Sequence, residues 1–358
     1  MRLNSVNPVR PFLVAPCLLL LALPAIPQQQ SDPKPQQQPA DQTTIRVQVN
    51  EVIVPVTVTD DKGRFVSNLE AKDFRILDEG KPQQIQFFSH SDRQPIVVGF
   101  LVDLSNASRI HWKTFQEQIR ELVWTLLPGD AQYRGYLIGF ANTAELLVNT
   151  TKDSDLIAEK ILRMRPAGGA AFYDAVHMAC TDRELVKGEP YEPRRVIIVI
   201  GDGHDSASKY TFDQVLELAQ KNLVTIYAIS TQSFGFNNES SDSLERLTTE
   251  TGGHVEYPLN SLYKDVSGYI STPKDAGNYV YEAGTGGYAA EISAGLVRAI
   301  QGIAGEVTTQ YVLRYIPDVD ASSKTKLFRR IKVEIPSLPT VNIHARKGYY
   351  PSGLTGPQ

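Results

Sequence analysis

Cysteine is almost absent from this sequence, which contains only Cys17 and Cys180. Cys17 lies in an N-terminal segment that we expect to be removed, so the mature chain would have no intramolecular disulfide. Cys180 ends an apolar pattern and is predicted to be a small buried hydrophobic side chain. His177 lies about one helical turn away, but the pair has no orienting acid or oxyanion site, so we do not predict a catalytic thiol.

An excess of charge is also absent. The formal net charge is −4, and acidic and basic residues are interspersed. There is no basic face for a nucleic acid and no polybasic patch for a membrane surface. With 358 residues and 42% hydrophobic content, the chain is long enough for two domains and a full core. We therefore expect a globular protein with no nucleic-acid partner and no membrane contact beyond its N-terminal segment.

The apolar run near the N-terminus is short for a membrane span. It is about a dozen residues long, follows Arg2 and Arg10, and ends among small residues such as Ala25. This pattern predicts a signal peptide over residues 1–27, with cleavage near Ala25 and an uncleaved anchor as the alternative. Its removal would change the formal net charge from −4 to −6. The predicted location is secreted or periplasmic.

The segment after the signal peptide is predicted to be a linker followed by strands. Residues 28–43 are rich in Gln and Pro and have too few apolar side chains to fold, which predicts a flexible linker. Residues 45–59 alternate and predict one or two strands, with a hairpin turn at 60–63. Residues 74–88 are predicted to form a second hairpin. These short strands are too few for a stable sandwich by themselves.

The C-terminal part supplies more alternating segments. They are residues 309–315, 330–335 and 341–345. We expect residues 44–94 and 307–351 to fold together into one β-sandwich that flanks a central domain, with residues 352–358 as a tail.

Residues 95–306 alternate apolar strands with helical patterns, which predicts an α/β domain with a doubly wound, mostly parallel, Rossmann-like sheet. The predicted strands are 96–102, 136–140, 146–148, 196–200, 225–229 and 254–257. The predicted helices are 110–127, 153–164, 173–184, 213–221 and 244–250.

Two of these strands are fully apolar and end abruptly in polar residues. Asp103 and Ser105 follow the first strand, and Asp202, His204 and Asp205 follow the second. In open α/β sheets, ligands bind beyond the carboxyl ends of the strands, so both acids are candidates for a ligand site. The alternative is that they are ordinary loop residues and helix caps.

With this order of elements, the chain resembles a von Willebrand factor type A domain, and residues 44–351 resemble the acidobacterial VWFA-related family of secreted proteins. The resembling motifs are Val58-Thr59-Asp60-Asp61-Lys62-Gly63, Leu69, Asp73-Phe74, Phe100-Leu101-Val102-Asp103-Leu104-Ser105, Gly168-Gly169-Ala170-Ala171-Phe172-Tyr173-Asp174-Ala175, Gly201-Asp202-Gly203-His204-Asp205 and Arg346-Lys347-Gly348-Tyr349-Tyr350.

The resemblance implies a metal-ion-dependent adhesion site, a cluster of oxygen ligands for Mg²⁺ or Mn²⁺. Asp103, Ser105 and Asp202 match its ligand positions, whereas Ala107 and Ala170 replace an expected Ser and Thr. Ser108 is one residue late and is predicted to point elsewhere. If each lost hydroxyl weakens binding about tenfold, the deficit is roughly 3 kcal/mol. We expect a degenerate site that is empty or weakly occupied, with a working Mg or Mn site as the alternative.

Residues 259–290 are a longer connection than a compact domain usually has and are predicted to be a functional insertion, with a disordered insertion as the alternative. Its tyrosines, set among glycines, are candidate partner contacts: Tyr263, Tyr269, Tyr279, Tyr281 and Tyr288.

Two functions from different classes follow. The first is a secreted, non-enzymatic interaction or adhesion module that binds an extracellular or periplasmic protein or polymer. The second is a metal-dependent hydrolase using Asp103, Asp202 and His204. The sequence has no activated nucleophile, phosphate-binding loop or zinc-protease motif, which disfavours the hydrolase.

Overall fold

The computed structural model describes residues 51–90, 95–109, 112–129, 132–186, 193–232, 239–259, 286–318 and 327–351. The predicted signal peptide, linker and tail lie outside these residues. So does most of the predicted insertion, together with the side chains of its five tyrosines.

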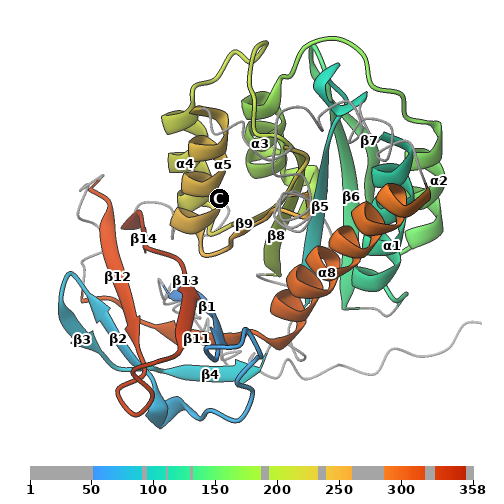
Figure 1. The fold of residues 1–358 in the computed structure, drawn as a ribbon. Coiled ribbons are helices and arrows are strands. Elements are labelled where there is room, and N and C mark those ends of the chain that lie inside the picture. The colour runs from blue at the N-terminus through green and yellow to red at the C-terminus, as the bar shows by residue number, and fades with distance from the viewer. Residues whose placement is uncertain are drawn as a thin grey trace, which may run out of the picture. The chain divides into compact units, whose positions relative to one another are not determined.

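The central domain is built on a six-stranded sheet (Figure 1). Its order is β10 (Val255–Glu256), β9 (Thr225–Ser230), β8 (Arg194–Gly201), β5 (Ile96–Asp103), β6 (Tyr133–Phe140) and β7 (Ala144–Thr151). All neighbouring strands are parallel except β6 and β7, which are joined by a short turn and run antiparallel. All eight residues of β5 are buried, as expected for a central strand covered on both faces. The predicted fold class is confirmed.

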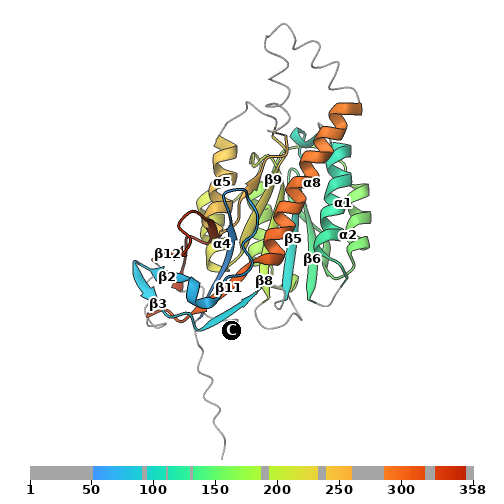
Figure 2. The ribbon, with the colours of Figure 1, turned by 60° about the horizontal axis from the view of Figure 1, so that its bottom comes forward.

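Helices cover both faces of this sheet. On one face lie α1 (Trp112–Leu126), α2 (Ser154–Arg163) and α8 (Gly286–Thr309), and their apolar residues share a core with alternate residues of β5. On the other lie α3 (Phe172–Thr181), α4 (Phe212–Lys221) and α5 (Glu239–Thr251). Figure 2 shows α8 beside α1. No helix of the described residues has both the length and the apolar character needed to cross a membrane.

Helix α8 was not predicted from the sequence. Because it begins at Gly286, the last part of the expected insertion is helical. Its buried residues include Ile292, Leu296, Ile300 and Ile303, which recur at helical spacing. This spacing is visible in the sequence and would have predicted the helix.

Segments from both ends of the described chain form two further antiparallel sheets, as predicted. One has the order β13 (Asn342–Ala345), β1 (Val52–Thr59), β11 (Tyr311–Tyr315) and β4 (Phe87–His90). The other has the order β14 (Gly348–Tyr349), β12 (Arg329–Glu334), β2 (Arg75–Asp78) and β3 (Lys81–Gln83). Side chains from both sheets share one hydrophobic core, in which Val54, Ile76 and Leu313 are fully buried.

The pairing of the second predicted hairpin was wrong in one respect. β2 pairs with β3 across a turn at Glu79 and Gly80, and not with the strand at residues 84–88. Phe87 and Phe88 belong to β4, which pairs with β11 in the other sheet. Phe88 there contacts Phe74 and Tyr311 at ring-centroid distances of 5.9 and 5.7 Å, so aromatic packing across the sheets accompanies this pairing.

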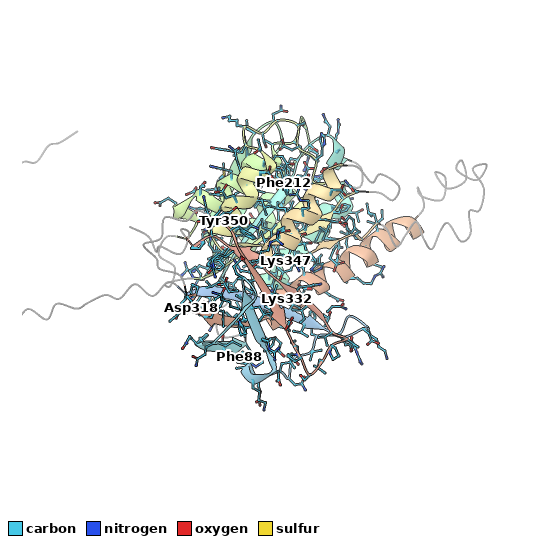
Figure 3. The ribbon with its side chains drawn as sticks, turned by 90° about the vertical axis from the view of Figure 1, so that its left-hand side faces the viewer. Phe88, Phe212, Asp318, Lys332, Lys347 and Tyr350 are labelled. Atoms are coloured by element: carbon cyan, nitrogen blue, oxygen red, sulfur yellow. The ribbon has the colours of Figure 1, made fainter. Side chains whose placement is uncertain are left out.

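The C-terminal strands contact the helices of the central domain. Arg346 donates a hydrogen bond from Nη2 to the carbonyl of Leu223, 2.9 Å away. The ammonium of Lys221 lies 5.4 Å from the ring centroid of Tyr350. Figure 3 shows Tyr350 and Lys347 in this region, between Phe212 of α4 and Lys332 of β12. The terminal sheets are therefore attached to the central domain by specific polar contacts.

Candidate functional site at the carboxyl edge of the central sheet

The two predicted acidic positions meet at one edge of the central sheet. β5 ends at Asp103 and its parallel neighbour β8 ends at Gly201, so Asp202 follows directly beside Asp103. A Cβ on Gly201 would lie only 2.8 Å from the Cβ of Asp103. Glycine is therefore required at position 201 for this close approach of the two strand ends.

Asp103 is almost completely buried, with 1% of its surface exposed. Its Oδ1 accepts a hydrogen bond from the backbone N–H of Ser105 (2.7 Å), and its Oδ2 accepts one from the Ser105 hydroxyl (3.2 Å). Burial raises the pKa of Asp103 to about 6, and the negative charge of Asp202 adds to this, against the lowering effect of the serines. A buried carboxylate of this kind is favourable for a cation.

Ser108 occupies a position that the sequence did not predict. The short 3₁₀ helix η3 (Ala107–Arg109) follows the first loop, and Ser108 within it is 5% exposed. Its hydroxyl is close enough to Asp103 to lower the pKa of that carboxyl group. The geometry is not that of a formed hydrogen bond, and the buried hydroxyl has no partner among the described residues. The expectation that Ser108 points elsewhere was wrong, because its hydroxyl lies near the Asp103 carboxyl group.

The loop of residues 168–170 joins the same edge. The Asn106 N–H donates to the carbonyl of Gly168 (3.0 Å), and the Gly169 N–H donates to Asn142 Oδ1 (2.6 Å). The Ala170 N–H donates to the Ser206 hydroxyl (3.0 Å). Ala170 is buried and supplies no side-chain oxygen. The loop after β5 and the loop after β8 are thus each hydrogen-bonded to the loop of residues 168–170, even though Ala170 is apolar.

Asn142 and Ser206 are polar residues of this edge that we did not predict as site residues. Asn142 is the second residue after the end of β6, a neighbour of β5 in the parallel part of the sheet. Its position after a strand end is the same signal that identified Asp103, so the sequence contained the information. Ser206 lies four residues after Asp202, and only its contact with Ala170 shows its role in holding the loops together.

The residues after Asp202 do not form a second cluster of ligands. Asp202 Oδ1 accepts a hydrogen bond from the His204 backbone N–H at 2.9 Å, and the His204 side chain is exposed. Asp205 instead accepts hydrogen bonds from the Tyr173 N–H, at the start of α3, and from the Ser208 hydroxyl. Asp205 therefore caps a helix, and the geometry offers His204 no position as a buried catalytic base.

The donor set fits a hard divalent cation. Mg²⁺ and Mn²⁺ take carboxylate, hydroxyl and water oxygens and accept waters where protein ligands are missing. Asp103 and Asp202 supply carboxylates, Ser105 a hydroxyl, and Ser108 a second hydroxyl that is buried and unpartnered. Ala107 and Ala170 supply none.

Comparisons with known proteins agree with this architecture. Residues 98–263 match the family model of the von Willebrand factor type A domain. This part of the chain therefore has a type A α/β fold, to which the antiparallel sheets from the terminal segments are added. Domains of this kind generally act as non-enzymatic modules for protein interaction. A comparison with curated proteins found no match.

Similar solved structures include the conserved hypothetical protein BatB from Bacteroides thetaiotaomicron, which is 18% identical with a TM-score of 0.37 over 49% of this chain and 97% of that chain. The type V pili tip protein Mfa5 from Porphyromonas gingivalis is 14% identical with a TM-score of 0.38, over 50% and 95% of the two chains. Proximal thread matrix protein 1 from the mussel byssus, in a structure with a zinc-occupied adhesion site, is 18% identical with a TM-score of 0.38, over 47% and 42%. We draw no functional conclusion from these likenesses.

Proposed function

We propose that this chain is an exported, non-enzymatic interaction module that binds an extracellular or periplasmic protein or polymer at the carboxyl edge of its central sheet. Export is supported by the N-terminal sequence, and the residues proposed for the signal peptide are 1–27. The resemblance to the acidobacterial VWFA-related family supports the same proposal. The proposed domains are the type A domain over residues 95–306 and the β-sandwich of residues 44–94 and 307–351.

We further propose that a divalent cation binds weakly at Asp103, Ser105 and Asp202, with Ser108 in place of the hydroxyl lost at Ala107. The observation that carries this proposal is the Ser108 hydroxyl, which is buried beside Asp103 without a hydrogen-bond partner. Leaving a hydroxyl buried and unpaired costs about 1–3 kcal/mol. A cation bound between Asp103 and Ser108 would offset that cost, and an acidic side chain of the partner would complete its coordination.

Ala170 remains a defect of the proposed site, because the Thr that the type A family places there would provide one more oxygen. The site would therefore hold its ion weakly, with waters at the missing positions. The tyrosines of the proposed insertion, residues 259–290, are the second proposed contact region.

A thermal melt of the full chain in EDTA and in 10 mM Mg²⁺, Mn²⁺ or Ca²⁺ tests the cation. For a dissociation constant of about 1 mM, the stabilisation is about 1.4 kcal/mol, which for a folded chain of this length corresponds to a rise in Tm of about 2 °C. The rise should be lost in Asp103→Ala and reduced in Ser108→Ala. It should increase in Ala170→Thr, provided that variant folds.

Ser89→Ala is the matched control, because Ser89 on β4 also has a buried hydroxyl without a partner but lies in a terminal sheet. It should leave the cation response unchanged. An unchanged Tm of the wild-type chain in all three cations would refute the weak metal site. The search for the binding surface would then move to the tyrosine-rich insertion and the terminal sheets.

A further inference from the structure

Three side chains from separate parts of the chain converge away from the carboxyl edge. They are His254, which directly precedes β10, Glu306 on α8 and His344 on β13. Glu306 Oε1 lies 3.4 Å from His254 Nδ1 and 3.0 Å from His344 Nδ1, and all three ligand atoms lie within 4.8 Å of one another. Glu306 is 5% exposed. The cluster thus lies where the central domain meets a terminal sheet.

Hydrogen bonding orients His254 for a ligand. Its Nε2 lies 2.9 Å from Glu256 Oε1, so this nitrogen carries a proton and donates it to the carboxylate. In the neutral imidazole, Nδ1 then has a free lone pair directed toward Glu306. A carboxylate behind a histidine in this way is the usual outer partner of a metal-binding imidazole.

Two atoms of these side chains are buried without a hydrogen-bond partner among the described residues. They are Nδ1 of His254 and Oε2 of Glu306. The Tyr227 hydroxyl is a further polar neighbour of Glu306, and it accepts a hydrogen bond from Gln310. A lone pair on His254 and a carboxylate oxygen at 3.4 Å repel each other unless a proton or a metal ion lies between them.

The surrounding residues leave room for this arrangement. Gly302 lies one turn before Glu306 on α8, and a Cβ there would be 2.9 Å from Glu256 Oε1. The Tyr227 ring meets the His254 ring edge-on, with centroids 5.6 Å apart. Gly302 therefore makes space for the carboxylate that orients His254, and Tyr227 restricts rotation of the imidazole.

We propose that His254 Nδ1, the Glu306 carboxylate and His344 Nδ1 bind one divalent transition-metal ion of the zinc class. In a tetrahedral zinc site, metal–ligand distances of about 2.0–2.1 Å place neighbouring ligand atoms about 3.3 Å apart. The distances of 3.4 and 3.0 Å to Glu306 fit this geometry. Two imidazoles and one carboxylate suit zinc and not magnesium. Since the side chain of His344 is 37% exposed, water can take the fourth position.

The charges around the cluster favour a cation. Two carboxylates, those of Glu256 and Glu306, lie within 3.4 Å of the His254 ring nitrogens, and Glu306 also lies 3.0 Å from His344 Nδ1. A divalent ion bound between His254 Nδ1 and Glu306 would displace any proton held there. Because the ligands lie just before β10, on α8 and on β13, the ion would link the type A domain to the terminal sheets.

Zinc titration of the untagged, chelator-treated full chain tests this site in the presence of excess Mg²⁺. The expected result is one equivalent of bound zinc, with calorimetric proton release and, for cobalt(II), the intense visible absorption of a tetrahedral complex. His344→Gln and Glu306→Gln should each abolish binding or weaken it more than tenfold. Glu256→Gln, which removes the outer carboxylate, should weaken binding about 10–100-fold.

Two controls separate this site from others. His177→Gln removes a histidine of α3 that stacks on Tyr210 and is not part of the cluster, and Asp103→Ala removes the adhesion-type site. Both should still bind one equivalent. Circular dichroism checks that each variant folds. If Glu306→Gln unfolds, the result for His344→Gln decides whether zinc binds at this cluster, because the side chain of His344 is partly exposed and less important for folding. Wild-type protein that binds no zinc, or that loses it in Asp103→Ala but keeps it in His344→Gln, would overturn the proposal and leave the cluster as a proton-linked ion pair.

Discussion

Asp103→Asn is expected to stabilise the metal-free protein at neutral pH. Asparagine has the shape of aspartate, and its Oδ1 can still accept the hydrogen bond from the Ser105 N–H that Asp103 accepts at 2.7 Å. Its amide can donate to the hydroxyls of Ser105 and Ser108. The substitution removes the negative charge of the Asp103 carboxylate, and Asp103 is only 1% exposed.

The size of the effect follows from the pKa of Asp103. Burial raises it from 3.8 to about 6, which corresponds to about 3 kcal/mol of destabilisation when the group is ionised in the folded state. The folded protein binds this proton more tightly than the unfolded chain does. The cost is therefore complete above pH 6 and disappears as the pH falls through the interval from about 6 to 4. A buried carboxylate that serves to bind a cation therefore lowers the stability of the cation-free protein.

Urea denaturation in EDTA at pH 7.5, 6.0, 5.0 and 4.5 would measure the effect. We expect the unfolding free energy of Asp103→Asn to exceed that of the wild type by up to about 3 kcal/mol at pH 7.5, with the difference falling to about 1 kcal/mol at pH 4.5. Asp61→Asn, at an exposed turn position, is the control and should match the wild type throughout. An Asp103→Asn protein that is less stable than the wild type at pH 7.5, or a difference that does not vary with pH, would refute the reasoning.

Three further outcomes are expected. Asp78→Ala should cost about 3–5 kcal/mol in urea denaturation, because it leaves the Arg329 guanidinium and two tyrosine hydroxyls without their shared buried carboxylate; the exposed Lys332→Ala should cause no measurable change. Burial raises the pKa of Cys180 to about 12, so its thiol should not react with a disulfide reagent at pH 8 until the protein unfolds. Gly253→Ala would place a Cβ 2.0 Å from the carbonyl oxygen of Ile226, and little soluble protein is expected; a Tm close to the wild type would contradict the close strand approach.

The local sequence pattern was sufficient to predict an element where the apolar residues followed one clear periodicity. The apolar run of residues 96–102 predicted a strand buried on both faces, and β5 is such a strand. Because parallel strands present their carboxyl ends at one edge, Asp103 and Asp202 were expected together, and the pairing of β5 with β8 confirms this. The co-folding of the two terminal segments was predicted because each segment has too few strands to form a stable domain by itself. Helix α8 was not predicted although its apolar residues recur at helical spacing, because the glycines and tyrosines that precede them are typical of a loop.

Tertiary structure alone decided three other features. The Ser108 hydroxyl lies near Asp103, within a short 3₁₀ helix. The spacing of residues in the sequence does not specify this local backbone conformation. Strand β4 joins β11 and not its neighbour β2, since the packing of Phe88 on Tyr311 outweighs sequence proximity. The meeting of His254, Glu306 and His344 depends on how a helix and a terminal sheet pack, and no short-range pattern encodes such a contact. Composition and periodicity determined which elements form and which ends of the strands carry acids, because both depend on neighbouring residues. The side chains that can share an ion were decided by the docking of distant segments, because only the folded chain brings them within a few ångströms.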